Sequence, residues 1–193
     1  VGEGARLSVE GVAATIALQG VVAGVGELRQ NIVLARNAQL HLALPALIVT
    51  EDAKVRSRTE INAAASAELV LIEQVSLGRF EESGGQWSGR ILADVDGRPV
   101  LRQTQSSDSV VQVLALDLQS ALPAGAIVSR LELGPSMCEL PTINSHGNAM
   151  VAVLEAGGTL HTSVGPSLAL AHRDLRELEQ MNRAAPPIPS QRV

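Results

Sequence analysis

The sequence predicts an all-β protein in which many short strands form packed, hairpin-rich sheets, with one or two helices, one of them at the C-terminus. Two observations support this fold class. Hydrophobic and polar residues alternate with a period of two along most of the chain, and turn-forming residues interrupt the alternation at short intervals. A helical spacing of apolar residues is sustained only near the end. The length of 193 residues suits one domain at 1–185, followed by an extended or disordered tail at 186–193.

The predicted strands are short runs in which apolar side chains would share one face of a sheet. Turns that contain glycine, proline, asparagine or aspartate separate most of them. In chain order the runs cover residues 6–10, 14–18, 31–35, 39–44, 46–49, 55–61, 67–77, 90–95, 98–104, 110–116, 127–133, 149–155 and 159–164.

Two connections between these runs predict β-hairpins. Asp96-Gly97 fits a two-residue turn in which both residues need positive φ angles. Ala156-Gly157-Gly158 joins a second pair of strand-like runs. Pro99 has no N–H to donate to a neighbouring strand, so it should lie at a strand start or at a sheet edge.

The C-terminal helix is predicted for residues 167–185. Its apolar residues recur at spacings of three and four, the pattern of an amphipathic helix: Leu168, Ala171, Leu175, Leu178 and Met181. Ser167 can cap the first turn, and Pro186 and Pro187 cannot continue the helix.

The composition argues against several classes of protein. Fifteen basic and twenty acidic residues give a net charge of −5, whereas a generic nucleic-acid binder needs a basic footprint. Phe80 and Trp87 are the only aromatic residues, so the chain lacks the stacking platforms that bind sugars or single-stranded nucleic acids. We therefore expect no nucleic-acid partner.

Cysteine usage and hydropathy predict the compartment. Cys138 is the only cysteine and fits a small buried residue better than a nucleophile; no disulfide can form within the chain, so we expect a cytoplasmic location. The apolar stretch at 12–25 contains Gln19 and Gly20 and is too short to span a bilayer, so no membrane association is expected. The chain begins at Val1 within a strand-like pattern, which favours a truncation at the N-terminus.

The sequence contains no motif that specifies catalysis or a bound metal. It has no phosphate-binding glycine loop, no HExxH and no CxxC. Its four histidines have no spacing that defines a metal site. We therefore predict that the protein is not an enzyme and holds no tightly bound cofactor.

Residues 54–61 alternate between charged and uncharged side chains. Lys54, Arg56, Arg58 and Glu60 would share one strongly charged face of a strand. The first interpretation is a solvated face or a guarded sheet edge, because charged residues protect edges from unwanted pairing. The second interpretation is a strip that binds a partner.

The strand at 67–77 places a carboxylate on an apolar face. With a period of two, Glu73 shares its face with four apolar residues: Leu69, Leu71, Val75 and Leu77. An ionised carboxylate in such surroundings is costly unless it is paired, hydrated or protonated. One interpretation is structural, with Glu73 either in a buried ion pair with an arginine such as Arg79 or turned outward by a bulge. The other is an internal polar channel or an interface.

A set of motifs lies between residues 44 and 99. They are Leu44-Pro45, a charged strand, a hydrophobic strand holding Glu73, then Gly78-Arg79 with Glu82, Trp87-Ser88-Gly89 and Asp96-Gly97-Arg98-Pro99. Together they resemble the urease accessory protein UreD family (also called UreH), in which a glycine stands at the position of Glu81. The start of the chain, Gly4-Ala5-Arg6-Leu7, resembles a strand of the same family. The length and composition are similar to those of short actinobacterial members.

The resemblance implies a β-rich, non-catalytic scaffold for urease maturation. Proteins of this family bind apo-urease and recruit a helical accessory protein of the UreF type and a GTPase of the UreG type, and the complex delivers nickel to the urease active site. By this resemblance, Glu73, Gly78, Arg79 and Glu82 are candidates for partner binding or nickel passage. Glu73 would be a weak ligand for nickel in transit, and no residue is a firm metal ligand.

A second interpretation is a non-enzymatic secreted or surface β-domain that acts as a binding module. The impossibility of an internal disulfide and the scarcity of aromatic residues weigh against it.

Overall fold

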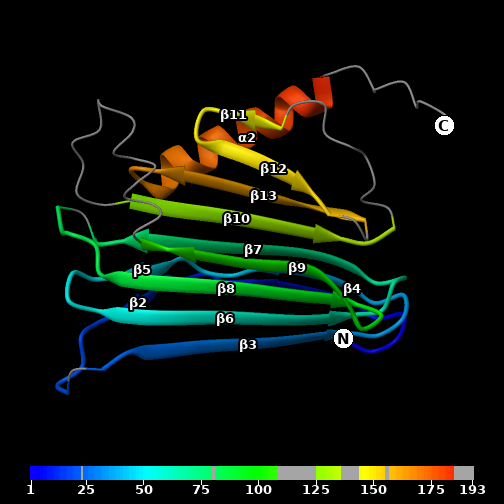
Figure 1. Ribbon diagram of the computed structural model, residues 1–193, viewed down its shortest axis with the longest axis horizontal. Coiled ribbons are helices and arrows are strands. Elements are labelled where there is room, and N and C mark those ends of the chain that lie inside the picture. Colours follow the sequence, from blue (N-terminus) through cyan, green and yellow to red (C-terminus); the bar gives the residue numbers. More distant parts are fainter. Residues whose placement is uncertain (23, 80, 108–124, 136–143, 155–156, 185–193) are drawn as a thin grey trace.

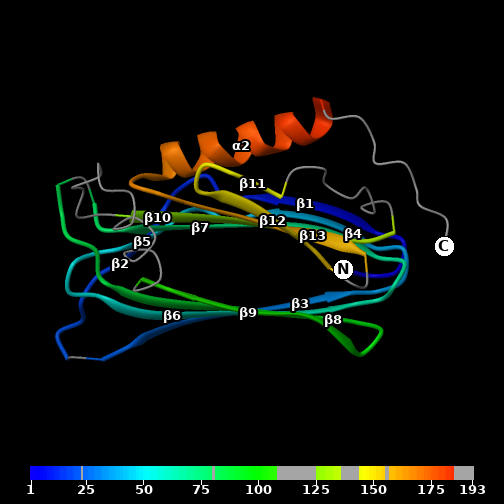
Figure 2. The ribbon, with the colours of Figure 1, turned by 45° about the horizontal axis from the view of Figure 1, so that its top comes forward.

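A computed structural model of the chain describes residues 1–193 except 23, 80, 108–124, 136–143, 155–156 and 185–193. Two β-sheets pack face to face, and one helix lies on the outer face of the larger sheet (Figure 1; Figure 2). The prediction of a mostly β protein with a helix near its C-terminus is confirmed.

The larger sheet follows the order β1-β4-β7-β10-β13-β12-β11, and the short strand β2 pairs with β5, which in turn pairs with β7. Its strands are β1 (Arg6–Glu10), β2 (Thr15–Ala17), β4 (Gln39–Ala43), β5 (Leu47–Val49), β7 (Glu68–Leu77), β10 (Gly125–Leu133), β11 (Ser145–His146), β12 (Ala149–Val153) and β13 (Gly158–Gly165).

The smaller sheet follows the order β3-β6-β8-β9. Its strands are β3 (Gly26–Leu34), β6 (Lys54–Ala63), β8 (Gln86–Val95) and β9 (Arg98–Ser106). Within the described residues β9 pairs only with β8, so Pro99 lies at the beginning of an edge strand, as predicted.

From β1 to β8 the chain winds as a parallel coil that alternates between the two sheets. β1, β4 and β7 run parallel in one sheet, and β3, β6 and β8 run parallel in the other. Arg6 lies opposite Gln39, and Gln39 opposite Glu68, so residues in register are 33 and 29 positions apart. The sequence shows no repeat of this length, because successive turns share only their inward and outward alternation and not residue identities.

Both predicted pairs of antiparallel strands are present in the structure. Asp96 and Gly97 have φ angles of 47° and 73°, and they join the antiparallel strands β8 and β9. β12 and β13 form the second antiparallel pair, although residues 155 and 156 of their connection lie outside the described part.

Some strand boundaries differ from those predicted. β3 begins at Gly26, five residues before the predicted run at 31–35, because its first half is exposed on both faces and shows no clear alternation of hydrophobicity. The two-residue strand β11 was too short to predict. The predicted strand at 110–116, Cys138 and the predicted tail at 186–193 lie outside the described residues.

Helix α2 (Leu168–Ala184) covers the outer face of the larger sheet (Figure 2). The Oγ of Ser167 accepts a hydrogen bond from the backbone N–H of Leu170 at 3.4 Å, so Ser167 caps the helix as predicted. The helix buries Ala171 and Leu175 against Val128 of β10. No helix among the described residues is both long enough and apolar enough to cross a membrane.

Candidate functional site

The interior between the two sheets contains two separate apolar clusters. On β7, Leu69 and Leu71 belong to one cluster, whereas Val75 and Leu77 belong to the other. Glu73 occupies the inward position between them. On β10, Leu131 and Ile127 are divided between the same two clusters, and Ser129 lies between them.

The level of Glu73 is polar across both sheets. Here we call Thr59, Glu73, Gln105 and Ser129 the polar layer. Thr59 Oγ1 donates a hydrogen bond of 2.5 Å to Glu73 Oε1, which links the two sheets. Ser129, directly opposite Glu73 in β10, donates to Gln105 Oε1 at 3.4 Å and makes a second link. The layer therefore crosses the sandwich from one sheet to the other.

The carboxylate of Glu73 has no cationic partner among the described residues. Burial raises the pKa of Glu73 above its ordinary value, and the hydrogen bond from Thr59 opposes this rise. Thr59 is almost completely buried, whereas Glu73 is half-buried and keeps some contact with solvent. Glu73 is therefore an inward acid that reaches water but meets no fixed positive charge.

Both structural interpretations of Glu73 are wrong. Arg79 does not pair with it, because the Arg79 guanidinium binds Glu82. No bulge turns Glu73 outward either, because β7 and β10 keep a continuous register from Leu69 opposite Leu133 to Leu77 opposite Gly125.

The larger sheet is irregular beside Glu73, on the side of β7 that faces away from β10. β4 pairs with β7 as far as Ala43 opposite Ile72, and β5 resumes with Leu47 opposite Val75. Three residues, 44–46, therefore lie beside only two of β7. The Leu44-Pro45 motif thus forms the break in the strand next to Glu73, and Gln74 Nε2 stabilises the break by donating to the Leu44 carbonyl at 3.1 Å.

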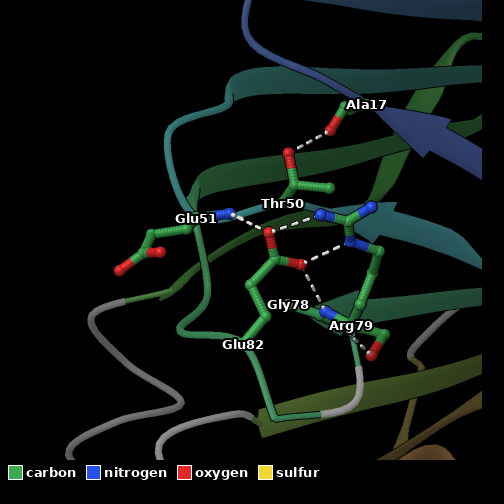
Figure 3. Close-up of polar contacts among 7 residues, drawn as sticks. Ala17, Thr50, Glu51, Gly78, Arg79 and Glu82 are labelled. Atoms are coloured by element: carbon green, nitrogen blue, oxygen red, sulfur yellow. Dashed lines mark hydrogen bonds and ion pairs between the residues drawn. The ribbon is translucent and has the colours of Figure 1, made fainter.

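Gly78, Arg79 and Glu82 form a turn at the end of β7, which we call the Arg79–Glu82 turn (Figure 3). Arg79 Nε donates to Glu82 Oε2 at 2.8 Å, and Arg79 Nη2 donates to Glu82 Oε1 at 3.1 Å. The backbone N–H of Arg79 donates to Glu82 Oε2 at 3.0 Å, and that of Glu51 donates to Glu82 Oε1 at 3.5 Å. The two side chains therefore close the turn and fasten it to the loop after β5.

The backbone of the turn explains its glycine. Gly78 has a φ of +87°, and a Cβ added there would lie 2.5 Å from the Glu82 carbonyl oxygen. Glu81 has a φ of +59° and so takes the left-handed conformation that glycine favours, at the position where the resembling family has glycine. Glu81 therefore carries backbone strain that a glycine at this position would not.

The electrostatics of the turn are opposite to those of Glu73. The hydrogen bonds from the Arg79 side chain, and then that from its backbone, lower the pKa of Glu82 to about 2. The same pairing raises the pKa of Arg79. The Arg79 side chain is nevertheless 57% exposed, against 17% for Glu82. Three of the four predicted site residues therefore meet in one turn, and Glu73 lies apart from them.

The charged strand predicted at 54–61 is β6, which lies in the middle of its sheet between β3 and β8. The interpretation as a guarded edge is therefore wrong. Arg56 and Arg58 do lie on a solvated face, as the alternation predicts. The sequence did not reveal that Arg29 and Arg90 join them, because the pairing across the parallel coil leaves no signal in the sequence.

No group of three or more histidine, cysteine, aspartate or glutamate side chains within the described residues is arranged to hold a metal ion. A single inward carboxylate can offer one oxygen ligand to a passing cation, but the described residues near Glu73 do not complete a coordination shell.

A family model described as UreD urease accessory protein matches residues 1–140 of the chain. The urease accessory protein UreD of Parafrankia sp. (strain EAN1pec) is 39% identical over 99 residues, which cover 51% of this chain and 33% of that protein. That of Frankia alni is 37% identical over 97 residues, covering 50% and 33%. Urease accessory protein UreD 2 of Saccharopolyspora erythraea is 32% identical over 100 residues, covering 52% and 35%. The aligned parts thus span only about a third of these relatives.

Proposed function

The chain belongs to the UreD family of urease accessory proteins, and from this membership we propose that it acts in urease maturation as a non-catalytic scaffold. In this proposal it binds apo-urease in the cytoplasm. It also recruits a helical accessory protein of the UreF type and a GTPase of the UreG type for the delivery of nickel.

Exposed apolar residues support a role in binding other proteins. Between residues 7 and 28 many large apolar side chains face solvent, and Val12 and Val21 are fully exposed. Exposed apolar clusters of this kind mark interaction surfaces. β1, which carries two of these residues, also lies at an edge of the larger sheet, where one of its sides pairs with no strand among the described residues.

The observation on which the nickel proposal rests is Glu73 in the polar layer. An inward carboxylate that reaches water and has no cation beside it costs stability. A divalent cation in transit would provide the missing positive charge, and a single carboxylate would release it again because the coordination is incomplete. Glu73 would therefore be one step on an internal path for nickel and not a storage site.

The test replaces Glu73 with glutamine and compares it with Glu3→Gln, which removes an exposed carboxylate before β1. The variants are expressed with the urease subunits and the other accessory proteins, and the complex is purified. Nickel per urease is measured by elemental analysis, and assembly by co-purification. We expect Glu73→Gln to lower nickel content several-fold with assembly unchanged, and Glu3→Gln to behave as the original protein. Equal nickel contents would contradict a role for Glu73 in transit.

We propose the Arg79–Glu82 turn as a second contact point, with exposed Arg79 facing a partner and Gly78 and Glu82 holding it. Arg79→Ala is compared with Arg36→Ala, which removes another exposed arginine that is paired with a glutamate. We expect only Arg79→Ala to weaken co-purification of a urease complex component. Loss of the folded state in Arg79→Ala, or unchanged binding, would restrict the turn to a structural role.

A further inference from the structure

The outer face of the smaller sheet carries an unusual concentration of arginine. Arg29, Arg58 and Arg90 lie directly opposite one another on the parallel strands β3, β6 and β8. Arg56 lies one outward position before Arg58 on the central strand. We call these four residues the arginine face, and all four are exposed.

Carboxylates of the protein pair with only half of this charge. Arg29 forms an ion pair with Glu27 at 2.7 Å, and Arg58 forms one with Glu60. Arg56 and Arg90 have no ion-pair partner among the described residues. The face therefore keeps two unpaired guanidinium groups.

The stability of the fold does not favour three arginines side by side. Neighbouring strands lie about 4.8 Å apart, so Arg29, Arg58 and Arg90 place three positively charged side chains next to one another across the sheet. Like charges directly opposite each other on a sheet repel and destabilise the pairing. A ligand that supplied negative charge would relieve this repulsion.

The face is shaped to receive a ligand along the strands. Its side chains enclose a shallow cavity of about 360 Å³, lined by all four arginines together with Glu27, Ser88 and Thr104. A second, smaller cavity of about 250 Å³ continues along β3 and β6 between Arg29, Asn31, Arg58 and Glu60. The two cavities therefore present guanidinium, hydroxyl and amide groups and two carboxylates to a ligand.

From this face we propose that the smaller sheet docks an acidic segment of a partner protein, with carboxylates pairing to Arg56 and Arg90. Guanidinium groups match carboxylates in a bidentate geometry. The chain as a whole is acidic, with a net charge of −5, so the face is a local positive region that would also orient an approaching acidic surface.

A protein partner fits better than a nucleic acid. A generic nucleic-acid binder needs a basic footprint, whereas the whole chain carries a net charge of −5. The face has no aromatic side chain on which a base could stack.

The test uses the full chain and a fluorescently labelled 12-residue peptide of alternating glutamate and valine, with glutamine replacing glutamate in a control peptide. Arg56→Glu/Arg90→Glu removes both unpaired cations. Arg176→Glu, an exposed arginine on helix α2 of the other sheet's outer face, is the matched control. Binding is followed by fluorescence anisotropy at low and high salt, and folding by circular dichroism.

We expect the double variant to bind the acidic peptide about tenfold or more weakly, with most of the difference lost at high salt. Arg176→Glu should bind as the original protein does. If Arg56→Glu/Arg90→Glu fails to fold, Arg56→Gln/Arg90→Gln replaces it and should show a loss in the same direction. Equal binding of the acidic and glutamine peptides, or equal binding by all variants, would overturn the proposal.

A 20-base-pair DNA duplex serves as the competing ligand. Tighter binding of the duplex than of the acidic peptide, lost in the double variant, would overturn the assignment to a protein. None of these measurements needs urease components. A negative result would therefore overturn the proposal for the arginine face and leave the proposed role in urease maturation intact, and the reverse also holds.

Discussion

Glu73 and Glu82 are nine residues apart, and the protein treats the two carboxylates in opposite ways. Glu82 accepts two hydrogen bonds from the Arg79 side chain and one from its backbone, and its pKa falls to about 2. Glu73 accepts one hydrogen bond, from the neutral hydroxyl of Thr59, and burial raises its pKa.

The difference separates a structural carboxylate from one that is available for binding. Glu82 has fixed partners for its charge, so a visiting cation would have to displace Arg79. Glu73 lies between two apolar clusters without such a partner. A half-buried carboxylate that has no cationic partner among the described residues is a stronger candidate for function than one that closes a turn.

The largest effect is expected for Gly78→Ala in the turn. The new Cβ would lie 2.5 Å from the Glu82 carbonyl and would be held at a φ of +87°. We expect a loss of about 2–4 kcal/mol in the free energy of unfolding. The measurement is urea unfolding followed by the fluorescence of Trp87, the only tryptophan.

Gly97→Ala is the matched control for that variant. Gly97 also has a positive φ, of 73°, but a Cβ there would meet nothing within 4 Å. Gly97→Ala should therefore lower the free energy of unfolding only by the backbone strain, about 1–2 kcal/mol. Equal losses in the two variants would show that the contact with Glu82 contributes nothing.

Glu73→Gln is expected to raise stability at neutral pH by about 1–3 kcal/mol, because it removes a partly desolvated charge and keeps an acceptor for Thr59. The raised pKa means that the folded state binds the proton more readily than the unfolded state. Wild-type stability should therefore fall as the pH rises from about 4.5 through the folded-state pKa.

The check is a series of urea titrations from pH 4 to pH 8. The curves of the wild type and Glu73→Gln should approach each other at low pH and separate as the pH rises. A glutamine variant that is less stable than the wild type at every pH would mean that Glu73 has a stabilising partner after all.

Glu82→Gln is expected to lower stability by a smaller amount, since the Arg79 side chain of the pair is largely exposed. The pKa of Glu82 is depressed, so its contribution is complete above about 4.5 and disappears as the pH falls toward 2. The difference between the wild type and the variant should shrink over this acidic range. A difference that is independent of pH would argue against the ionised pair.

The smallest effect is expected for Glu81→Gly. Glycine relieves the left-handed strain at φ +59°, worth about 1–2 kcal/mol, but its greater freedom in the unfolded chain offsets about 0.5–1 kcal/mol. The same unfolding assay should therefore show a small gain in stability for Glu81→Gly and no change in stability for Glu81→Ala. A clear loss in Glu81→Gly would mean that the Glu81 side chain holds the turn.

Much of the local structure could be predicted from the sequence. The strand alternation, the Asp96-Gly97 hairpin and the amphipathic helix at 168–184 depend on residues close together in the chain. The inward position of Glu73 followed from the same period of two, because its neighbours Leu71 and Val75 face the interior. Motifs that depend on local backbone conformation, such as Gly78-Arg79, were also visible.

The partners of the charged groups could not be predicted. Arg79 is close enough in sequence to suggest a pair with Glu73, but on an extended strand six residues span about 20 Å, and the turn brings Glu82 to it instead. The arginine face was visible only as Arg56 and Arg58, because Arg29 and Arg90 are about thirty residues away on either side.

The sequence by itself determined which residues of each strand point inward, where the tight turns fall and where the helix begins, because these depend on local sterics and on the period of hydrophobicity. Tertiary structure alone decided that the strands wind as a parallel coil, that Thr59 is the partner of Glu73, and that four arginines share one face. Those outcomes depend on register between distant strands, which is fixed by packing two sheets together and leaves no local mark on the chain.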